Sequence, residues 1–136
     1  LRIVSDIGSR LPIYCTSQGK VFLAHMSRTS AEALLRAQHM TQFTPHTITD
    51  LTALMQEIDL CRTDGYAIEN GEYKIGLRSI SAPVYTVEGK ARYTVGVIGM
   101  FRSTRSDEFL AAVEQVCATA SMISTALGYR KTEELL

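Results

Sequence analysis

The chain has 136 residues, of which 46% are hydrophobic and 21% charged, a composition typical of an ordinary globular domain with one sizeable core. Its formal net charge is zero, so it lacks the basic surface expected of a domain that binds nucleic acid by itself. No apolar run is long enough to cross a bilayer, and no basic-then-apolar leader is present. The chain has three cysteines, an odd number, and they are widely spaced at Cys15, Cys61 and Cys117. This pattern indicates a reducing, cytoplasmic setting rather than a disulfide scaffold.

The first half of the chain predicts one strand followed by three helices. The strand covers residues 1–7 and ends at Gly8; because the chain opens inside it without a methionine, we expect a piece of a longer protein. Apolar spacing predicts helices at residues 16–26, 31–38 and 50–64. Their expected N-caps are Thr16 or Ser17, Ser30 and Thr49. Gly65 is expected to end the third helix.

An acidic segment follows at residues 69–72. Glu69 and Glu72 could form an acid–base pair, but a solvent-exposed acidic turn is the favoured interpretation. Residues 75–101 predict two long strands joined at Glu88-Gly89, since apolar and polar side chains alternate along the first strand and glycine suits a tight turn. A last helix is expected from a cap within residues 103–106 to Leu127. The order of elements predicts an α+β domain in which helices cover an antiparallel sheet.

Two glycines stand inside the second predicted strand, where glycine costs packing and conformational entropy. For Gly96 and Gly99 two explanations remain open: a bulge, or the close approach of a backbone or ligand.

Motifs for metal or covalent chemistry are weak. His25, His39 and His46 have no metal-ligand spacing, and no cofactor fingerprint follows the strand glycines, so neither a metal nor a cofactor is expected. Cys15 precedes a predicted helix N-terminus, where a thiolate could be stabilised, but no base can be assigned to it. The helix start at residues 16–20 offers free backbone N–H groups and hydroxyls. Anion binding and simple capping are equally good interpretations of that start.

Several blocks of sequence together resemble the C-terminal effector-binding domain of IclR-type bacterial transcription regulators. They occur in the family's order from Gly8 to Tyr129. The blocks are GSRLPIY (8–14), GK (19–20), FTPHTITD (43–50), GYA (65–67), GLRSISAPV (76–84), VIG (97–99) and LGY (127–129).

The resemblance implies a GAF-like curved antiparallel sheet flanked by helices, with a small molecule on its concave side. Residues 1–136 would form the effector-binding domain of a repressor-type regulator that is not an enzyme. DNA would be bound only through an N-terminal winged helix-turn-helix, absent here along with an initial helix and hairpin of this domain. The partners implied are a small carboxylate or sugar-acid metabolite and further copies in a homodimer or homotetramer.

The resemblance also implies positions for effector contacts between the first helix start and the sheet. Ser17 and Gln18 would meet a carboxylate with backbone N–H groups, and Glu69 would accept a hydrogen bond from a ligand hydroxyl. The remaining implied contacts are Leu77, Ser79, Gly96 and Ile98 on the strands, with Ile3, Leu11 and Gly71 around the rim.

Two further residues, Gly96 and Arg78, carry expectations about their roles in the sheet. Gly96 stands where some members have serine, so a serine there is expected to narrow ligand choice without unfolding the domain. Arg78 should face the opposite side of the sheet and serve as a structural ion-pair partner.

Two rival functions remain open. One is a GAF-like enzyme that uses Cys15 or Glu69, and the other is a ligand-free oligomerisation module built on the last helix or the tail.

Overall fold

The computed structural model describes residues 6–131, and within them the chain forms an α+β fold with an antiparallel sheet, as predicted. The expected strand at residues 1–7 lies largely outside this range, and its last described residue, Ile7, is part of a turn. The elements are α1 (Ser17–Ala24), α2 (Arg28–Ala37), α3 (Leu51–Asp64), β1 (Ala67–Asn70), β2 (Arg78–Tyr85), β3 (Ala91–Gly99) and α4 (Asp107–Ala126).

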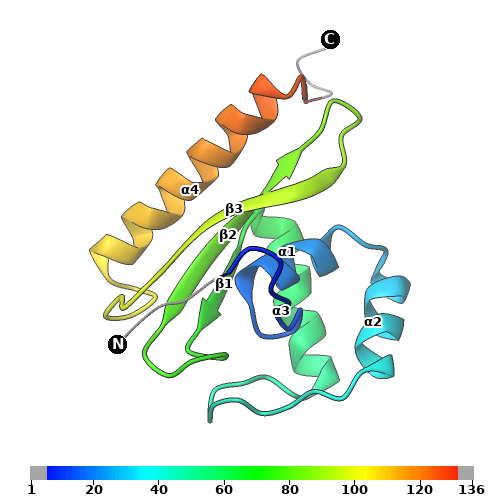
Figure 1. Ribbon diagram of the computed structural model, residues 1–136, viewed down its shortest axis with the longest axis vertical. Helices are drawn as coiled ribbons and strands as arrows, with labels where there is room; N and C mark the ends of the chain where they lie inside the picture. Colours follow the sequence, from blue (N-terminus) through cyan, green and yellow to red (C-terminus); the bar gives the residue numbers. More distant parts are fainter. Residues whose placement is uncertain (1–5, 132–136) are drawn as a thin grey trace.

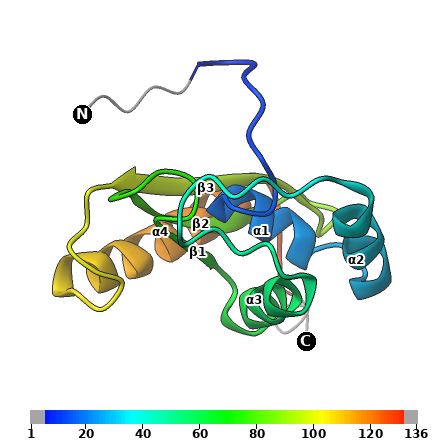
Figure 2. The same cartoon turned by 90° about the horizontal axis from the view of Figure 1, so that it is seen from below.

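The sheet has the order β1-β2-β3, and both pairings are antiparallel. Helix α4 lies against one face, while α1 and α3 lie on the other side (Figures 1 and 2). In register, Ser79 is opposite Glu69 on β1 and opposite Ile98 on β3. Because directly opposed residues point to the same face, the two faces of the sheet can be assigned residue by residue.

The face toward α4 is mostly apolar. Alternate residues of β2 pack there against one stripe of the helix; the buried set is Ile80, Ala82, Val84, Phe109, Val116 and Ala120. By length and composition alone α4 could cross a membrane, which the sequence analysis did not anticipate. In this fold the helix instead covers the sheet, and its Phe109, Val116 and Ala120 side chains pack against β2.

A second apolar cluster joins α1, α2 and α3 to β1 on the other side of the sheet. Its members include Val21, Leu23, Leu35, Leu54 and Ile58. Burial of several sides of α1 follows from its mostly apolar sequence, although Phe22 remains 39% exposed.

Several element boundaries differ from the predictions. Helix α2 begins three residues early because Ser27, not Ser30, accepts the capping hydrogen bond. Asp50, not Thr49, caps α3. The stretch expected to be an acidic loop begins as β1, whose register with β2 extends through Asn70. By contrast, Gly65 ends α3 as predicted, with the left-handed φ of 82° that glycine adopts at low cost.

Candidate functional site: a hydroxyl-lined cavity between α1 and the sheet

A cavity of about 240 Å³ lies between the start of α1 and the face of the sheet that α4 does not cover. Its floor comes from β1, β2 and β3, and its wall from the start of α1 and the loop before β2. The lining residues are Leu11, Thr16, Ser17, Gln18, Glu69, Tyr73, Lys74, Leu77, Ser79, Ser81, Thr94, Gly96, Val97 and Ile98.

The α1 start presents backbone donors to this cavity. Thr16 is the N-cap, and its hydroxyl accepts from the Gly19 N–H at 3.2 Å. In the part of the chain that the structure describes, the N–H groups of Ser17 and Gln18 have no acceptor. First-turn N–H groups carry the positive end of the helix dipole, so they can bind an anion.

Serine hydroxyls connect this helix start to the sheet. Ser17 Oγ lies 2.7 Å from Ser81 Oγ and accepts from Ser79 Oγ at 2.9 Å. All three side chains are at least 90% buried. Ser79 and Ser81 are the polar residues that alternate with the apolar positions of β2, so alternation along the strand gives a polar cavity floor on one face of the sheet and an apolar core on the other.

Glu69 is the buried acid of the cavity. Its side chain leaves β1 opposite Ser79, and the residue is only 2% exposed. One carboxyl oxygen accepts from the Glu72 N–H at 2.8 Å, and the other lies 3.3 Å from Ser79 Oγ. Burial raises the pKa of Glu69 above its usual value, with a smaller upward contribution from the charge of Glu72. The expected solvent-exposed acidic turn is therefore wrong, because both carboxylates are buried.

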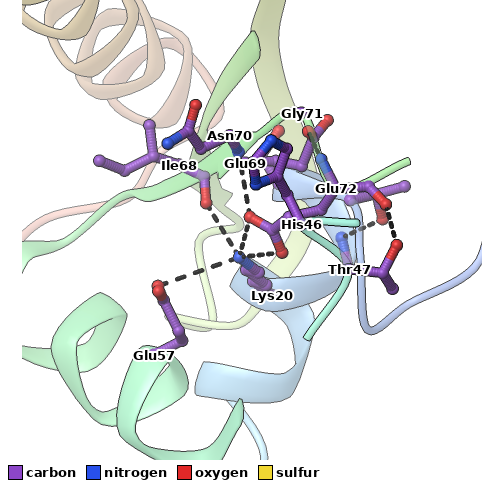
Figure 3. A network of polar contacts seen from close by, with 12 residues as sticks. Lys20, His46, Thr47, Glu57, Ile68, Glu69, Asn70, Gly71 and Glu72 are labelled. Atoms are coloured by element: carbon purple, nitrogen blue, oxygen red, sulfur yellow. Dashed lines mark hydrogen bonds and ion pairs between the residues drawn. The ribbon is translucent and has the colours of Figure 1, made fainter. Parts of the chain in front are cut away.

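Glu72 belongs to a neighbouring ion-pair network (Figure 3). Lys20 extends from α1 with 1% exposure and lies 2.8 and 2.9 Å from the two carboxylate oxygens of Glu72. The same ammonium donates to the Ile68 carbonyl at 3.1 Å, and Glu57 of α3 lies 3.9 Å away. The network connects α1 to the β1–β2 loop. It adjoins Glu69, whose carboxyl group accepts from the Glu72 N–H.

The cavity brings together every residue of the implied effector site except two. Ile3 lies outside the described residues. Gly71 is buried beside the cavity, where its N–H donates to the Leu77 carbonyl and its own carbonyl accepts from Thr44. It shapes the loop before β2 and does not line the cavity. Four of the remaining residues, Gln18, Gly96, Ile98 and Leu11, lie at exposed positions of the wall and rim.

Six lining residues lie outside the implied effector site: Thr16, Tyr73, Lys74, Ser81, Thr94 and Val97. Ser81 carried a usable signal, because it lies two residues after Ser79 on the same strand and must share its face. Tyr73 and Lys74 come from the loop before β2, whose path no local pattern predicts.

Gly96 lines the cavity, but its role differs from the one expected. A Cβ atom built there would lie 2.4 Å from the Ile80 carbonyl oxygen and 2.5 Å from Ser81 Oγ. The glycine therefore permits close approach of β2, and a serine there would require the neighbouring strand to shift. That a serine would narrow ligand choice without unfolding the domain stays a prediction, but the substitution should cost stability. By contrast, a Cβ at Gly99 would make only an ordinary contact, 3.4 Å from the Phe101 ring.

Arg78 faces away from the cavity, as the register requires. It donates to Asn70 Oδ1 at 2.7 Å and to the Phe101 carbonyl at 2.6 Å. Both acceptors are neutral, and within residues 6–131 Arg78 has no acidic partner, which corrects the expected ion pair.

Cys15 is fully buried next to the N-cap of α1 and does not line the cavity. Burial, together with the charges of Glu72 and Glu69, raises the pKa of its thiol to about 12. A thiol protonated at neutral pH and closed off from the cavity is a poor nucleophile.

The sequence and the fold match one family. The model of the family described as bacterial transcriptional regulator IclR C-terminal matches residues 1–125. The chain belongs to this family.

Relatives and solved structures agree with that assignment. The HTH-type transcriptional repressor AllR of Escherichia coli K12 is 29% identical over 130 residues, which are 96% of this chain and 48% of AllR. The chain thus spans about half the length of the curated relatives it matches. A putative transcriptional regulator from Rhodococcus sp. RHA1 superposes with a TM-score of 0.86 at 30% identity, covering 93% of this chain and 52% of that one.

A third similar structure was solved with a bound ligand. The inducer-binding domain of the transcription factor PobR from Acinetobacter, solved as a double mutant in complex with 3-hydroxybenzoic acid, superposes with a TM-score of 0.74 at 25% identity. The match covers 91% of this chain and 73% of that one.

Proposed function

We propose that this IclR-family domain senses a small organic acid or sugar-derived acid, which binds in the cavity between α1 and the sheet. The observation that carries the proposal is the convergence of free N–H groups, three serine hydroxyls and a buried acid around one cavity of about 240 Å³. Pockets with a few convergent polar groups are typical of small-molecule sites, and this volume suits a metabolite rather than a polymer.

The polarity of the cavity favours a carboxylate. The ligand's carboxylate would accept from the N–H groups of Ser17 and Gln18 at the positive end of α1. Lys74, at the rim of the same cavity, adds a positive charge at the entrance. The apolar side chains of Leu77 and Ile98 would contact the carbon skeleton. The PobR complex supports this class, because 3-hydroxybenzoic acid combines a carboxyl group, a hydroxyl group and an apolar body.

Ligand binding would regulate DNA binding by a longer cytoplasmic protein. The chain matches about half of AllR, which is described as an HTH-type repressor, so the DNA-binding module would lie in the other half. An effector can shift such a protein only if it binds two arrangements with different affinity. We place those arrangements in a homodimer or homotetramer. Its subunits would associate in part through the exposed Leu110, Met122 and Leu127 of α4 and the residue after it.

A thermal-shift screen of small carboxylic acids tests the proposal. A ligand present at one hundred times its Kd should stabilise the domain by about 2.7 kcal/mol, which raises Tm measurably. The amide of each acid is the matched control and should raise Tm less, because it lacks the charge that the α1 start favours. A folded domain whose Tm responds to no acid would contradict the proposal.

Enzymatic alternatives have less support. The buried Cys15 does not line the cavity, and the described part of the chain holds no cluster of metal-ligating side chains. The comparisons name transcription regulators, which are not enzymes.

A further inference from the structure

The FTPHT block (43–47) forms a tight turn that carries two buried hydroxyl groups. Pro45 suits the second position of such a turn, and the Thr47 N–H closes it by donating to the Thr44 carbonyl at 3.2 Å. Within the turn, the Thr44 hydroxyl accepts from the His46 N–H at 3.0 Å, and the Thr47 hydroxyl accepts from the Thr44 N–H at 2.9 Å. Both threonines are at least 90% buried. Each hydroxyl therefore keeps its single hydrogen for an acceptor outside the turn.

The two hydrogens go to consecutive carbonyl groups of the loop after β1. Thr44 Oγ1 donates to the Gly71 carbonyl at 2.6 Å, and Thr47 Oγ1 donates to the Glu72 carbonyl (Figure 3). Neither threonine is among the residues that line the cavity, whereas the two residues that follow Glu72 are. The turn therefore holds, from outside the cavity, the loop that forms part of its wall.

The carbonyl that Thr44 binds belongs to the same peptide group as the Glu72 N–H, and that N–H donates to Glu69 Oε2 at 2.8 Å. Because a peptide group is planar and its C=O and N–H point in opposite directions, fixing the carbonyl at one end fixes the N–H at the other. The φ of Gly71 is +64°, so the chain enters this peptide group through a conformation that glycine adopts at low cost. A continuous path of hydrogen bonds thus runs from the Thr44 hydroxyl to the Glu69 carboxyl group.

The Glu72 N–H is the contact that orients the Glu69 carboxyl group. The other carboxyl oxygen, Oε1, lies 3.3 Å from Ser79 Oγ, which is longer than a usual hydroxyl hydrogen bond. The titratable groups around Glu69 are Glu72, Lys20 and Cys15, and the Lys20 ammonium pairs with Glu72. Burial raises the pKa of Glu69, and the hydrogen bond from the Glu72 N–H counteracts this rise by favouring the ionised form.

We infer that Thr44 is a positioning residue of the effector site, which acts through the Gly71–Glu72 peptide group to hold the Glu69 carboxyl group in place. With Oε2 fixed by the Glu72 N–H, Oε1 is left on the Ser79 side to accept from a hydroxyl group of the effector. The inference rests on the proposed function. The family resemblance implies the Glu69 contact, and the Thr44 hydroxyl would set the direction of that contact from outside the cavity.

Thr44→Val removes the hydroxyl while keeping the shape of the side chain, and Thr63→Val is its matched control. The Thr63 hydroxyl also donates to a backbone carbonyl, that of Asp59 at 3.2 Å, but this residue is exposed on α3. Thr44→Ser retains the hydroxyl. If Thr44→Val does not fold, Thr44→Ala removes the hydroxyl without placing a methyl group against the Gly71 carbonyl.

The first readout compares acids with and without a hydroxyl group. Each variant is titrated by calorimetry with 3-hydroxybenzoate against benzoate and with lactate against propionate. Thr44→Val should bind the hydroxylated acid of a pair about tenfold more weakly, as expected if Glu69 is correctly oriented about one tenth of the time. Its affinity for the acid without the hydroxyl should be nearly unchanged. Thr44→Ser and Thr63→Val should bind as wild type does.

A double-mutant cycle tests the path of hydrogen bonds. In a Glu69→Ala background, Thr44→Val should cause no further loss of affinity for the hydroxylated acid, because the carboxyl group through which Thr44 acts is gone. A full additional loss would mean that Thr44 affects binding by another route, which contradicts the inference.

The second readout needs no ligand. The side-chain carboxyl ¹³C signal of Glu69 reports the titration of this group. Thr44→Val should raise the pKa of Glu69 further, because the hydrogen bond from the Glu72 N–H favours the ionised form and is weakened when its peptide group is released. Thr44→Ser and Thr63→Val should titrate as wild type does.

The outcomes separate this inference from the proposed function. An unchanged Glu69 titration in folded Thr44→Val or Thr44→Ala overturns the inference, whether or not any ligand binds. Equal losses of affinity for both acids of a pair also overturn it, because the turn would then only stabilise the cavity as a whole. If neither these probes nor any acid in the thermal-shift screen binds wild type, the proposed function fails, and the Glu69 titration still decides whether Thr44 positions this carboxyl group.

Discussion

Gly96 and Ser81 are directly opposed in the β2–β3 pairing, and the Ser81 side chain occupies space that a side chain on Gly96 would need. The Ser81 hydroxyl, bonded to Ser17, stands where a Cβ on Gly96 would reach, and the Ile80 carbonyl stands closer still. The hydroxyl at this point of the floor is therefore supplied by β2, not by β3.

Gly96→Ser should destabilise the domain. The added Cβ would meet a backbone oxygen that cannot rotate away, and overpacking of this kind costs about 1–3 kcal/mol. Urea unfolding measures the loss, with Gly99→Ser as the matched control because only the Phe101 ring lies near its Cβ. The double variant Gly96→Ser/Ser81→Ala should remain destabilised, since the Ile80 carbonyl is unchanged. Full rescue by Ser81→Ala would show that the hydroxyl, not the backbone, requires the glycine.

Single residues show which side chains can be assigned from sequence. Ser17, Gln18 and Glu69 were placed through the family resemblance, because the order of blocks along the chain carries their positions. Lys20 was not recognised as buried, because a lysine in the first turn of a helix is usually solvated and its partner Glu72 lies 52 residues away. Pairings of that range leave no local pattern in the sequence.

At the scale of elements, α1 is held to the rest of the domain by charge as well as by apolar packing. Lys20 joins it to the loop after β1, and the Ser17 hydroxyl joins it to β2. These polar contacts set the distance between the helix start and the cavity floor.

Lys20→Met should therefore cost far more than loss of a surface ion pair. Removing one partner leaves Glu72 charged and buried, for which about 3–5 kcal/mol is typical. Arg36→Met is the matched control, because its pair with Glu32 on α2 is exposed and worth at most about 1 kcal/mol. Chemical denaturation of both variants gives the comparison. Equal losses would mean that Lys20 contributes only its apolar stem.

The elements themselves differ in how well sequence predicts them. The β2–β3 hairpin and α4 were predictable because each shows a regular apolar pattern over many residues and a clear turn or cap. Strand β1 was missed because it has only four residues, two of them polar, and its inward-facing Glu69 breaks the apolar alternation that marks a strand. The buried Glu69 is therefore the residue that made this strand hard to recognise from the sequence.

At the scale of the whole molecule, the sheet separates an apolar core from a polar cavity. The α4 face supplies stability through Ile80 and its neighbours, and the α1 face carries the groups proposed to bind the effector. The fold class followed from the order of elements, whereas the cavity required the three-dimensional path of the loop before β2.

The buried acid also makes the stability of the domain depend on pH. The folded-state pKa of Glu69 is raised above 4.5, so the folded domain holds this proton more tightly than the unfolded chain. Its contribution is fully present below pH 4.5 and is lost as pH rises through the folded-state pKa. The unfolding free energy of wild type should decline over that window. Glu69→Gln should flatten this part of the curve, and Glu88→Gln should leave it unchanged; parallel curves for all three proteins would refute the assignment.

The alternation of β2 has a consequence for how such a regulator can diverge. Ser79 and Ser81 line the cavity, while Ile80, Ala82 and Val84 pack against α4, so the residues proposed to bind the effector and the core residues occupy positions of opposite parity on one strand. If the cavity binds the effector as proposed, substitutions at the odd-numbered positions would change the ligand while the even-numbered positions keep the core intact. A lineage would then change the signal it responds to without losing the fold.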